Sequence, residues 1–207
     1  GCVISISHTV EEPNTFDINV DVQSNVICHG TATGEVVFSI TDTTYSAGFD
    51  YQVFEQITNN PVTGVLNHAN LGPTPVLNIN AGDYYVVITQ DSNPFCANQE
   101  NFSIAGPDAA ITANTAVTDI TCNPGADGII EVINVQGGWG GYAYYVSTTP
   151  NPDEFDVSNY GANPRFENLA AGTYEVWVID QNGCPQQLPD VTLATPTPIV
   201  ADLQINN

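Results

Sequence analysis

The sequence contains almost no basic side chains. Its 207 residues include no Lys and a single Arg, Arg165, against 23 Asp and Glu, which gives a formal net charge of −22. Nucleic-acid binding is excluded, because no basic surface is available to displace counterions from phosphates. Binding to anionic membrane surfaces is excluded for the same reason. The charge is typical of a surface that repels its own copies or that gathers divalent cations.

Long apolar runs and helical periodicity are also missing. No apolar run approaches the roughly 18 residues that span a bilayer, so we expect no membrane insertion. No long segment has the period of an amphipathic helix. Charged residues make up only 12% of the chain and hydrophobic residues 42%. We therefore expect a folded chain rather than a disordered acidic tail.

The residues that carry catalysis are scarce. The only imidazoles, His8, His29 and His68, fall in different predicted strands and loops. No Ser-His-Asp or Cys-His order recurs. No Cys-x-x-Cys pair indicates zinc, and no Gly-rich loop joins a strand to a helix to cradle a phosphate. We interpret the three His as surface residues and predict that the protein is not an enzyme.

What the sequence does contain is an internal repeat. The stretch "INAGDYYVVITQDSNPFC" ends at Cys96, and "LAAGTYEVWVIDQNGC" ends at Cys184. The same 94 residues separate Cys28 from Cys122 and Cys2 from Cys96. Such a fixed offset is the signature of a repeat. The predicted parts are the last strand of a preceding repeat (1–12), repeat one (13–107), repeat two (108–195) and the first strand of a following repeat (196–207).

Each copy is predicted to consist of short strands. Runs such as "TFDINVDV", "GEVVFSI" and "YEVWVI" alternate with period two, and turns rich in Gly, Asn and Pro separate them. Short strands in a unit of about 90 residues indicate a seven-strand sandwich of immunoglobulin type. The predicted fold class is therefore all-β, with tandem immunoglobulin-like β-sandwiches arranged end to end.

The strand after each Ala-Gly pair has two predicted faces. We place Tyr84 and Tyr174 at its start, where such sandwiches often have a Tyr that bonds back to the preceding corner. The residues predicted to face inward are Tyr84, Val86, Ile88, Tyr174, Val176 and Val178; those predicted to face outward are Glu175, Trp177 and Ile179.

Copy two resembles a known family. The resemblance rests on Cys122 with Gly128 six residues later, on "GGWGGYAYY" and on "FENLAAGTYEVWVIDQNGC". These features are similar to the SprB repeat of giant cell-surface adhesins of gliding Bacteroidota, and the similarity covers nearly all of residues 108–195. It implies an extracellular adhesive filament on the outer surface of a Gram-negative bacterium, exported by the type IX secretion machinery. The family has no catalytic residues. Copy one has "TDTTYSAG" in place of the Gly-rich stretch.

Five cysteines in a strand-rich extracellular chain predict disulfides. Because each copy repeats both cysteines, we predict Cys28–Cys96 and Cys122–Cys184, with Cys2 unpaired. In an immunoglobulin-type order the two cysteines of one copy lie at opposite poles, beyond the roughly 7 Å between Cα atoms that a disulfide allows. The pairing therefore requires the segment after the first cysteine to run beside its own sandwich. The alternative is a Cys28–Cys184 bond between neighbouring modules.

Exposed aromatic residues are the candidates for ligand contact. Trp139 lies at a predicted hairpin tip, and its four neighbouring glycines cannot cover it. Trp177 faces outward. Trp139 with Tyr142 or Tyr145 would form an aromatic platform on which a sugar ring could stack. The predicted contacts are Trp139, Trp177 and Tyr145. The alternative is that each Trp lies on a sheet surface or against the neighbouring module.

Calcium is the one cofactor for which the sequence offers ligands. Asp153, Glu154 and Asp156 lie in the "NPDEFD" loop, and calcium prefers such oxygen ligands. The alternative is a solvated acidic loop, and we expect no other cofactor. Thr43 lies in a "DTT" stretch that resembles a short O-glycosylation signal of Bacteroidota.

The repeats and the lack of catalytic residues favour a non-catalytic stalk segment of a secreted, filamentous adhesin. Its predicted partners are adjacent repeats of the same long chain and surface polysaccharide. One alternative is a carbohydrate-binding module of a secreted enzyme. The other is a structural fibre subunit that assembles by strand donation from residues 1–12.

Overall fold

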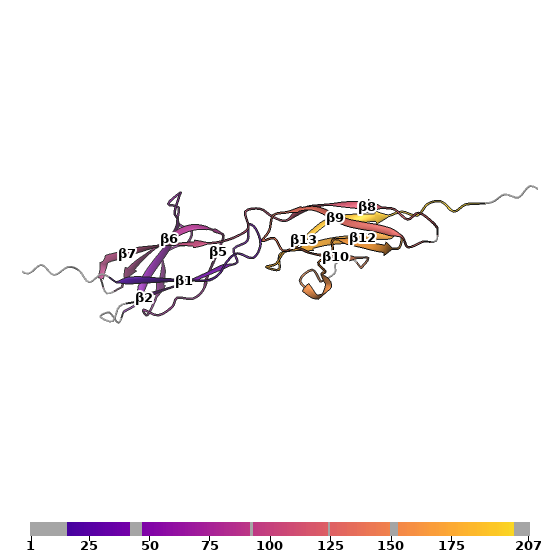
Figure 1. Cartoon of the computed structure of the whole chain (residues 1–207). Coiled ribbons are helices and arrows are strands. Elements are labelled where there is room, and N and C mark those ends of the chain that lie inside the picture. The colour runs from indigo at the N-terminus through magenta and orange to yellow at the C-terminus, as the bar shows by residue number, and fades with distance from the viewer. Residues whose placement is uncertain (1–15, 42–46, 92, 124, 150–152, 201–207) are drawn as a thin grey trace, which may run out of the picture. The chain divides into compact units, whose positions relative to one another are not determined.

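The computed structural model describes residues 16–41, 47–91, 93–123, 125–149 and 153–200, with the side chains of residues 93–96 left out. The chain divides into two compact units (Figure 1). The first comprises residues 1–26 and 32–105, and the second comprises residues 27–31 and 106–207. The short segment 27–31 thus leaves the first unit and belongs by its contacts to the second. The predicted end strand 1–12 and residues 201–207 of the predicted end strand 196–207 lie outside the described residues, and residues 196–200 form no strand.

The first unit is a sandwich of two antiparallel sheets. One sheet has the order β1-β2-β5 and the other the order β4-β3-β6-β7. Side chains from both sheets form one core, in which Phe38, Phe49 and Val86 have no exposed surface. The strands are β1 (Asp17–Ser24), β2 (Gly34–Thr41), β3 (Phe49–Glu55), β4 (Leu66–His68), β5 (Leu77–Ile79), β6 (Gly82–Gln90) and β7 (Asn93–Ile104).

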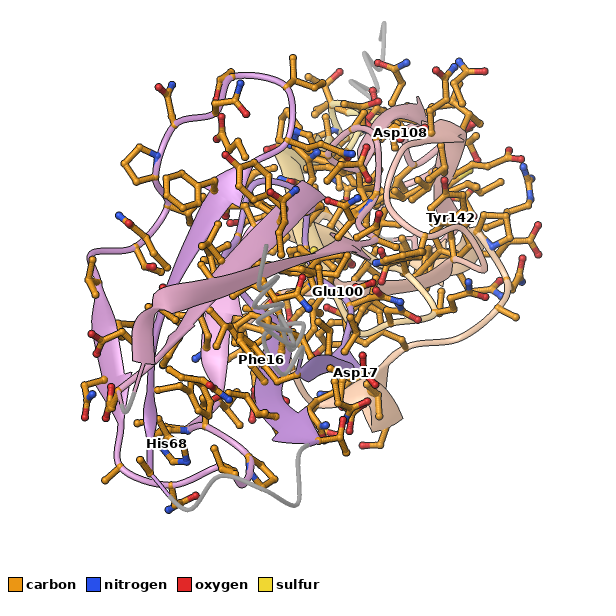
Figure 2. The ribbon with its side chains drawn as sticks, turned by 90° about the vertical axis from the view of Figure 1, so that its left-hand side faces the viewer. Phe16, Asp17, His68, Glu100, Asp108 and Tyr142 are labelled. Atoms are coloured by element: carbon orange, nitrogen blue, oxygen red, sulfur yellow. A yellow bond between two sulfur atoms is a disulfide. The ribbon has the colours of Figure 1, made fainter. Side chains whose placement is uncertain are left out.

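Phe16 and His68, both labelled in Figure 2, take part in the packing of the first unit. Phe16 precedes β1 and is 2% exposed, and its carbonyl accepts a hydrogen bond from Asn98 Nδ2 at 2.8 Å. The ring of His68 meets Phe49 edge to face, with 5.4 Å between ring centroids. His68 is therefore a packing residue rather than the surface residue that we predicted.

The second unit repeats this arrangement. Its sheets have the orders β8-β9-β11 and β10-β12-β13, and they share a core that includes Ile130, Val176 and Leu193. The described residues form six strands here, against the predicted seven. The elements are β8 (Thr112–Thr118), β9 (Gly128–Gln136), β10 (Ala143–Ser147), the 3-10 turn η1 (Val157–Asn159), β11 (Arg165–Leu169), β12 (Gly172–Ile179) and β13 (Pro185–Leu193).

The alternating sequence determines which face of each strand is buried. Tyr174, Val176 and Val178 on β12 are buried, as are their counterparts on β6, which confirms the predicted inward faces. Glu175 and Trp177 are half-buried on the opposite face. Ile179, which was predicted to share the outward face, is 4% exposed between its register neighbours Ala143 and Pro185, so this end of the face is covered. The all-β prediction is confirmed.

Each unit contains the expected tyrosine at its corner. Tyr84 Oη donates to the carbonyl of Asn80 at 3.0 Å, and Tyr174 Oη donates to the carbonyl of Ala170 at 2.9 Å. Both bonds reach back four residues along the chain. This contact is typical of immunoglobulin-like sandwiches, so the two copies share a detail of fold as well as sequence phase.

The glycine-rich segment 137–142 is not the hairpin that the sequence suggested. β9 pairs with β8 and β11, whereas β10 pairs with β12, so the segment crosses from one sheet to the other. Gly137, Gly138, Gly140 and Gly141 all have positive φ angles between 58° and 80°. Residues with a Cβ rarely adopt this conformation, so the crossing needs glycine.

No helix in the described part of the chain is long and apolar enough to cross a membrane.

Candidate functional site: a disulfide cluster and an aromatic face

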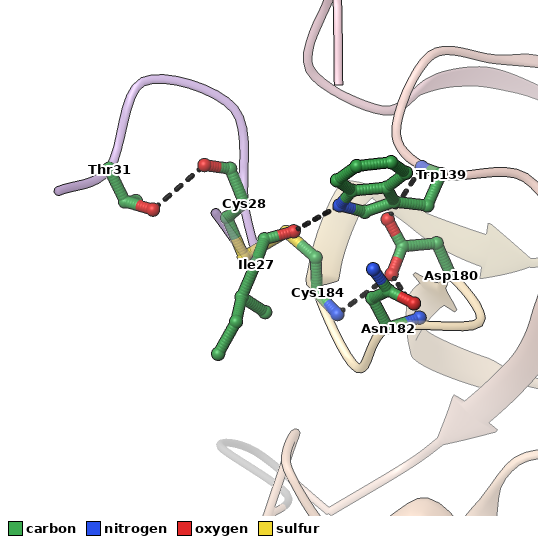
Figure 3. The surroundings of a disulfide bond; sticks show 7 residues. All are labelled: Ile27, Cys28, Thr31, Trp139, Asp180, Asn182 and Cys184. Atoms are coloured by element: carbon green, nitrogen blue, oxygen red, sulfur yellow. Dashed lines mark hydrogen bonds between the residues drawn. A yellow bond between two sulfur atoms is a disulfide. The ribbon is translucent and has the colours of Figure 1, made fainter. Parts of the chain in front are cut away.

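A disulfide joins Cys28 to Cys184 in the second unit (Figure 3). The two Cα atoms are 5.3 Å apart, and 156 residues separate the cysteines in sequence. The predicted bonds of Cys28 with Cys96 and of Cys122 with Cys184 are therefore wrong, and the alternative pairing is found. The physical reason is that residues 27–31 do not run beside their own sandwich but pack in the second unit. Cys122 is exposed and free.

Cys2 and the side chain of Cys96 lie outside the described part of the structure. The same holds for Thr43, so the O-glycosylation prediction also falls outside the described residues.

Trp139 holds the segment that carries Cys28. Its indole Nε1 donates to the carbonyl of Ile27 at 3.0 Å, and its own carbonyl accepts from Gln181 Nε2 at 3.0 Å. The side chain is half-buried rather than displayed on a hairpin tip. Trp139 is thus part of a disulfide cluster, which we define as Ile27, Cys28, Trp139, Asp180 and Cys184.

Asp180 organises the other side of the disulfide cluster. It follows β12 directly and is 4% exposed. Its Oδ2 accepts from the backbone N–H of Trp139 at 2.9 Å, and its Oδ1 accepts from the N–H groups of Asn182 and Cys184 at 3.0 Å each (Figure 3). A buried carboxylate is costly unless it is hydrogen-bonded. One carboxylate therefore fixes both the Gly-rich crossing and the turn that presents Cys184.

A second group of aromatic residues lies on the outward face of the β10-β12-β13 sheet. Tyr145 on β10 is the register neighbour of Trp177 on β12. The Tyr145 ring also lies near Tyr160, with 5.7 Å between centroids. All three side chains are half-buried. Trp177 Nε1 donates a hydrogen bond to Glu175 Oε2 at 3.4 Å. We call Tyr145, Tyr160 and Trp177 the aromatic face. Sequence reasoning found two of its members and missed Tyr160.

The loop before β11 positions Tyr160. The hydroxyl of Tyr160 donates to the backbone carbonyl of Glu154 at 2.9 Å. The next residue, Gly161, exchanges two backbone hydrogen bonds with Tyr144 on β10, at 2.8 and 2.9 Å. Burial, reinforced by the negative charge of Glu154, raises the pKa of the Tyr160 phenol to about 12. Tyr160 therefore stays neutral at physiological pH.

Tyr142 does not extend this face. Its hydroxyl donates to the carbonyl of Gly137 at 2.6 Å, and its ring packs against the core of the second unit. The platform of Trp139 with Tyr142 or Tyr145 is consequently not formed, because Trp139 belongs to the disulfide cluster and Tyr145 to the aromatic face.

The predicted calcium ligands serve as turn acceptors. Asp156 Oδ1 accepts from the N–H and hydroxyl of Ser158 at 3.1 and 2.6 Å, which caps η1 and lowers the pKa of Asp156. Asp153 Oδ1 accepts from the N–H of Phe155 at 3.2 Å. Among the residues that the structure describes, no group of three His, Cys, Asp or Glu side chains is placed to hold a metal ion. Asp153, Glu154 and Asp156 thus do not form the predicted cluster.

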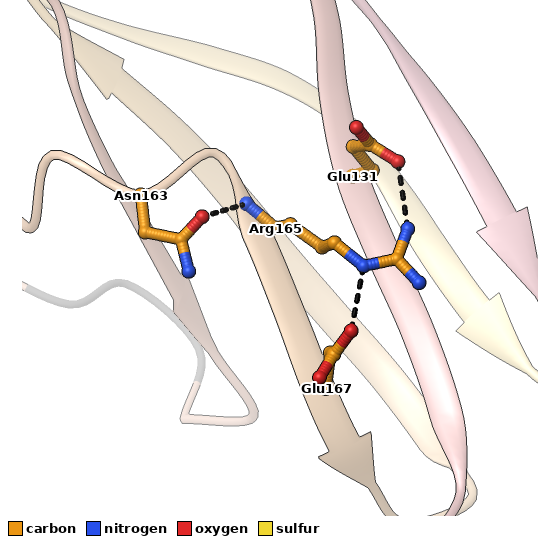
Figure 4. A network of polar contacts seen from close by, with 4 residues as sticks. All are labelled: Glu131, Asn163, Arg165 and Glu167. Carbon is orange, nitrogen blue, oxygen red and sulfur yellow. Dashed lines mark hydrogen bonds and ion pairs between the residues drawn. The ribbon is translucent and has the colours of Figure 1, made fainter.

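The single basic side chain is neutralised within its own sheet. Arg165 on β11 contacts Glu167 Oε1 at 2.7 Å through Nε and Glu131 Oε2 at 2.9 Å through Nη1 (Figure 4). These two carboxylates raise the pKa of the guanidinium. No cationic patch therefore remains around it for an anionic ligand.

One family model matches part of the second unit. Residues 114–151 match the family model of the SprB repeat. This segment of the second unit is similar to the SprB repeat. The sequence resemblance is confirmed over this segment, which includes Cys122, Trp139 and Tyr145. The SprB repeat is a cell-surface adhesin-type module and a structural rather than catalytic family.

No protein of curated function matches the chain in sequence. Among solved structures, Tp47, the 47-kilodalton lipoprotein of Treponema pallidum, is matched with a TM-score of 0.28 and 13% sequence identity. The match covers 89% of this chain and 52% of that protein, so this chain spans about half the length of the lipoprotein.

Proposed function

We propose that the chain is a non-catalytic stalk segment of a secreted, filamentous cell-surface adhesin that serves surface attachment or gliding. The observation that carries the proposal is the repetition of one module. Both units have the same sheet order apart from the extra edge strand β4 of the first unit. They share the tyrosine bond and cysteines in phase, and part of the second unit matches the SprB repeat. A stalk needs such repeated modules, and it needs no converging catalytic groups.

The chemistry of the chain supports a place outside the cell. Disulfides persist in oxidising compartments, and the Cys28–Cys184 bond requires one. The net charge of −22 keeps neighbouring filaments apart. In this proposal the type IX machinery exports the chain, and its partners are adjacent repeats of the same long chain.

Surface labelling of the source cells tests this proposal. Antibodies raised against the chain should bind intact cells, and external protease should remove the signal. Labelling that requires permeabilised cells would contradict the proposal. Electron microscopy of the labelled cells distinguishes a stalk, which places label along a filament, from a compact surface protein.

A second candidate function is carbohydrate binding, which the aromatic face favours. Tyr145, Tyr160 and Trp177 present half-buried rings beside Glu175, and aromatic rings with nearby acceptors suit the apolar face and hydroxyls of a sugar. The test is affinity electrophoresis of the purified chain in gels that contain surface polysaccharide. Trp177→Ala should abolish any retardation.

Tyr85→Ala is the matched control for this test, because Tyr85 stacks on Phe54 in the first unit with 5.0 Å between centroids. Retardation that survives Trp177→Ala would remove the aromatic face from consideration. If the chain migrates without retardation in every polysaccharide gel, carbohydrate binding is rejected and only the stalk function remains.

A further inference from the structure

Cys122 occupies the position in repeat two that Cys28 occupies in repeat one. Each cysteine stands six residues before the Gly that begins the next strand, Gly34 of β2 and Gly128 of β9. Cys28 is bonded to Cys184, whereas Cys122 is an exposed free thiol. The two loops therefore differ in bonding although their sequence positions correspond.

The residue after each cysteine makes the same contact. His29 Nδ1 lies 2.9 Å from the carbonyl of Pro107, and Asn123 Nδ2 donates to the carbonyl of Pro196 at 3.4 Å. Both prolines follow the last strand of their copy, in "IAGP" and "LATP". The loop that carries Cys122 is thus held to the end of its copy in the way that the loop of Cys28 is held.

Corresponding pockets lie beside the two cysteines. The pocket at the disulfide has a volume of about 200 Å³ and is lined by residues 28–29, 110–111, 138 and 184–186. The pocket at Cys122 has a volume of about 340 Å³ and is lined by residues 121–123 and 196–199. Both pockets are thus lined by the cysteine, by the residue after it and by residues that follow the proline.

Exposed apolar side chains adjoin this second pocket. Ile199 and Val200 are 99% and 87% exposed. Counted from the two prolines, Val200 corresponds to Ile111, which is 4% exposed in the core of the second unit. An apolar residue thus stands four positions after each proline. Ile111 is covered by the core of the second unit, whereas Val200 is exposed.

We propose that Cys122 forms a disulfide with the counterpart of Cys184 in a further module of the same kind, which follows in series and covers Ile199 and Val200. The inference rests on the proposed stalk function and specifies how one module is bonded to the next. Each bond of this series would join the first cysteine of one repeat to the last cysteine of the next, as Cys28 is joined to Cys184.

The bond forms by oxidation of two thiols. The sulfurs of Cys122 and of the partner cysteine lose two protons and two electrons, and a disulfide oxidant such as oxidised glutathione accepts them and leaves as two thiols. Cys122 is exposed, so the oxidant has access to it.

An extended chain tests the inference. Residues 1–195 are followed by a second copy of residues 107–207, so that the added Pro107 takes the place of Pro196 and the phase is kept. The chain is oxidised in a glutathione buffer, labelled with iodoacetamide and digested at its acidic residues, because a single Arg makes trypsin ineffective. Mass spectrometry should find Cys122 bonded to the added copy's Cys184, with labelling of Cys122 at least about tenfold below that in the unextended chain.

The Cys28–Cys184 bond of the same molecules reports that the chain has folded. Cys122→Ser in the extended chain should leave the added copy's Cys184 open to labelling. A Cys122 that labels as fast as in the unextended chain, while Cys28–Cys184 is intact, would overturn the inference, and so would a Cys122–Cys122 bond between two chains. Neither result depends on where the protein resides, so this test fails or succeeds separately from the surface-labelling test.

Discussion

The indole of Trp139 donates its N–H to the carbonyl of Ile27 across 112 residues of sequence. One residue further on, Cys28 is bonded to Cys184, and the backbone N–H groups of both Trp139 and Cys184 donate to Asp180. The covalent bond and the indole thus hold residues 27–28, and the buried carboxylate fixes Cys184 and Trp139, to which these residues are attached. This arrangement predicts how the second unit responds to substitution.

Loss of the disulfide should destabilise the second unit. Cys184→Ser should lower its free energy of unfolding by roughly 2–5 kcal/mol, the usual cost of removing a native disulfide. Guanidinium titration followed by tryptophan fluorescence measures this, since Trp139 and Trp177, the only two Trp, both lie in this unit. Cys122→Ser is the control and should leave the midpoint unchanged. An equal shift in both variants would show that the bond does not stabilise the fold.

Asp180→Asn should also destabilise the second unit, by about 2 kcal/mol, because hydrogen bonds to a charged acceptor are worth roughly 1.5–3 kcal/mol. The amide keeps the shape of the carboxylate but replaces one acceptor oxygen with a donor, which faces a backbone N–H. Dithiothreitol should also reduce the Cys28–Cys184 bond faster in this variant than in the wild-type protein. Asp190→Asn, at an exposed position of β13, is the control. Wild-type stability in Asp180→Asn would contradict the role given to this carboxylate.

The corner tyrosine of each unit can be tested separately. Tyr174→Phe removes the bond to the Ala170 carbonyl and should cost the second unit about 1 kcal/mol. Tyr84→Phe removes the equivalent bond in the first unit and should leave the tryptophan-detected transition in place. A shift of that transition by Tyr84→Phe would mean that the two units do not unfold independently.

High pH should loosen the loop that carries Tyr160. The pKa of this phenol is raised from an ordinary value of 10.0 to about 12, so the folded form keeps a proton that the unfolded chain loses. The stabilisation is complete below pH 10 and is lost as the pH rises to about 12. The ionisation of the tyrosines can be followed by absorbance at 295 nm as the pH is raised. Tyr160→Phe should lack a step near pH 12 that the wild-type protein shows. A missing step near pH 10 would contradict the burial of this ring.

The sequence determined the strands and their faces because both follow from local alternation. Val176 and Val178 could be placed inward, and Tyr174 at its corner, from spacing alone. The repeat offset likewise showed that Cys28 and Cys122 correspond. The faces depend on neighbouring residues in the chain and the offset on a direct comparison of the two copies, so neither requires knowledge of long-range contacts.

The disulfide cluster could not be derived in the same way. An offset shows which cysteines correspond but not which module each one contacts, so Cys28 was assigned to Cys96 rather than to Cys184. The exposed position given to Trp139 failed for a related reason. Its glycine neighbours cannot cover the indole, but residues 27–31 approach it from a distant part of the sequence.

The Cys28–Cys184 bond also sets how far the protein can be drawn out by a mechanical load. A chain pulled from its two ends transmits tension through that bond, and the 156-residue separation between the cysteines cannot be extended while the bond is intact. At about 3.3 Å per residue, this withholds roughly 500 Å of contour length. In the proposed stalk, this bond would keep the chain from unfolding fully under shear, even after its hydrogen-bonded strands had separated.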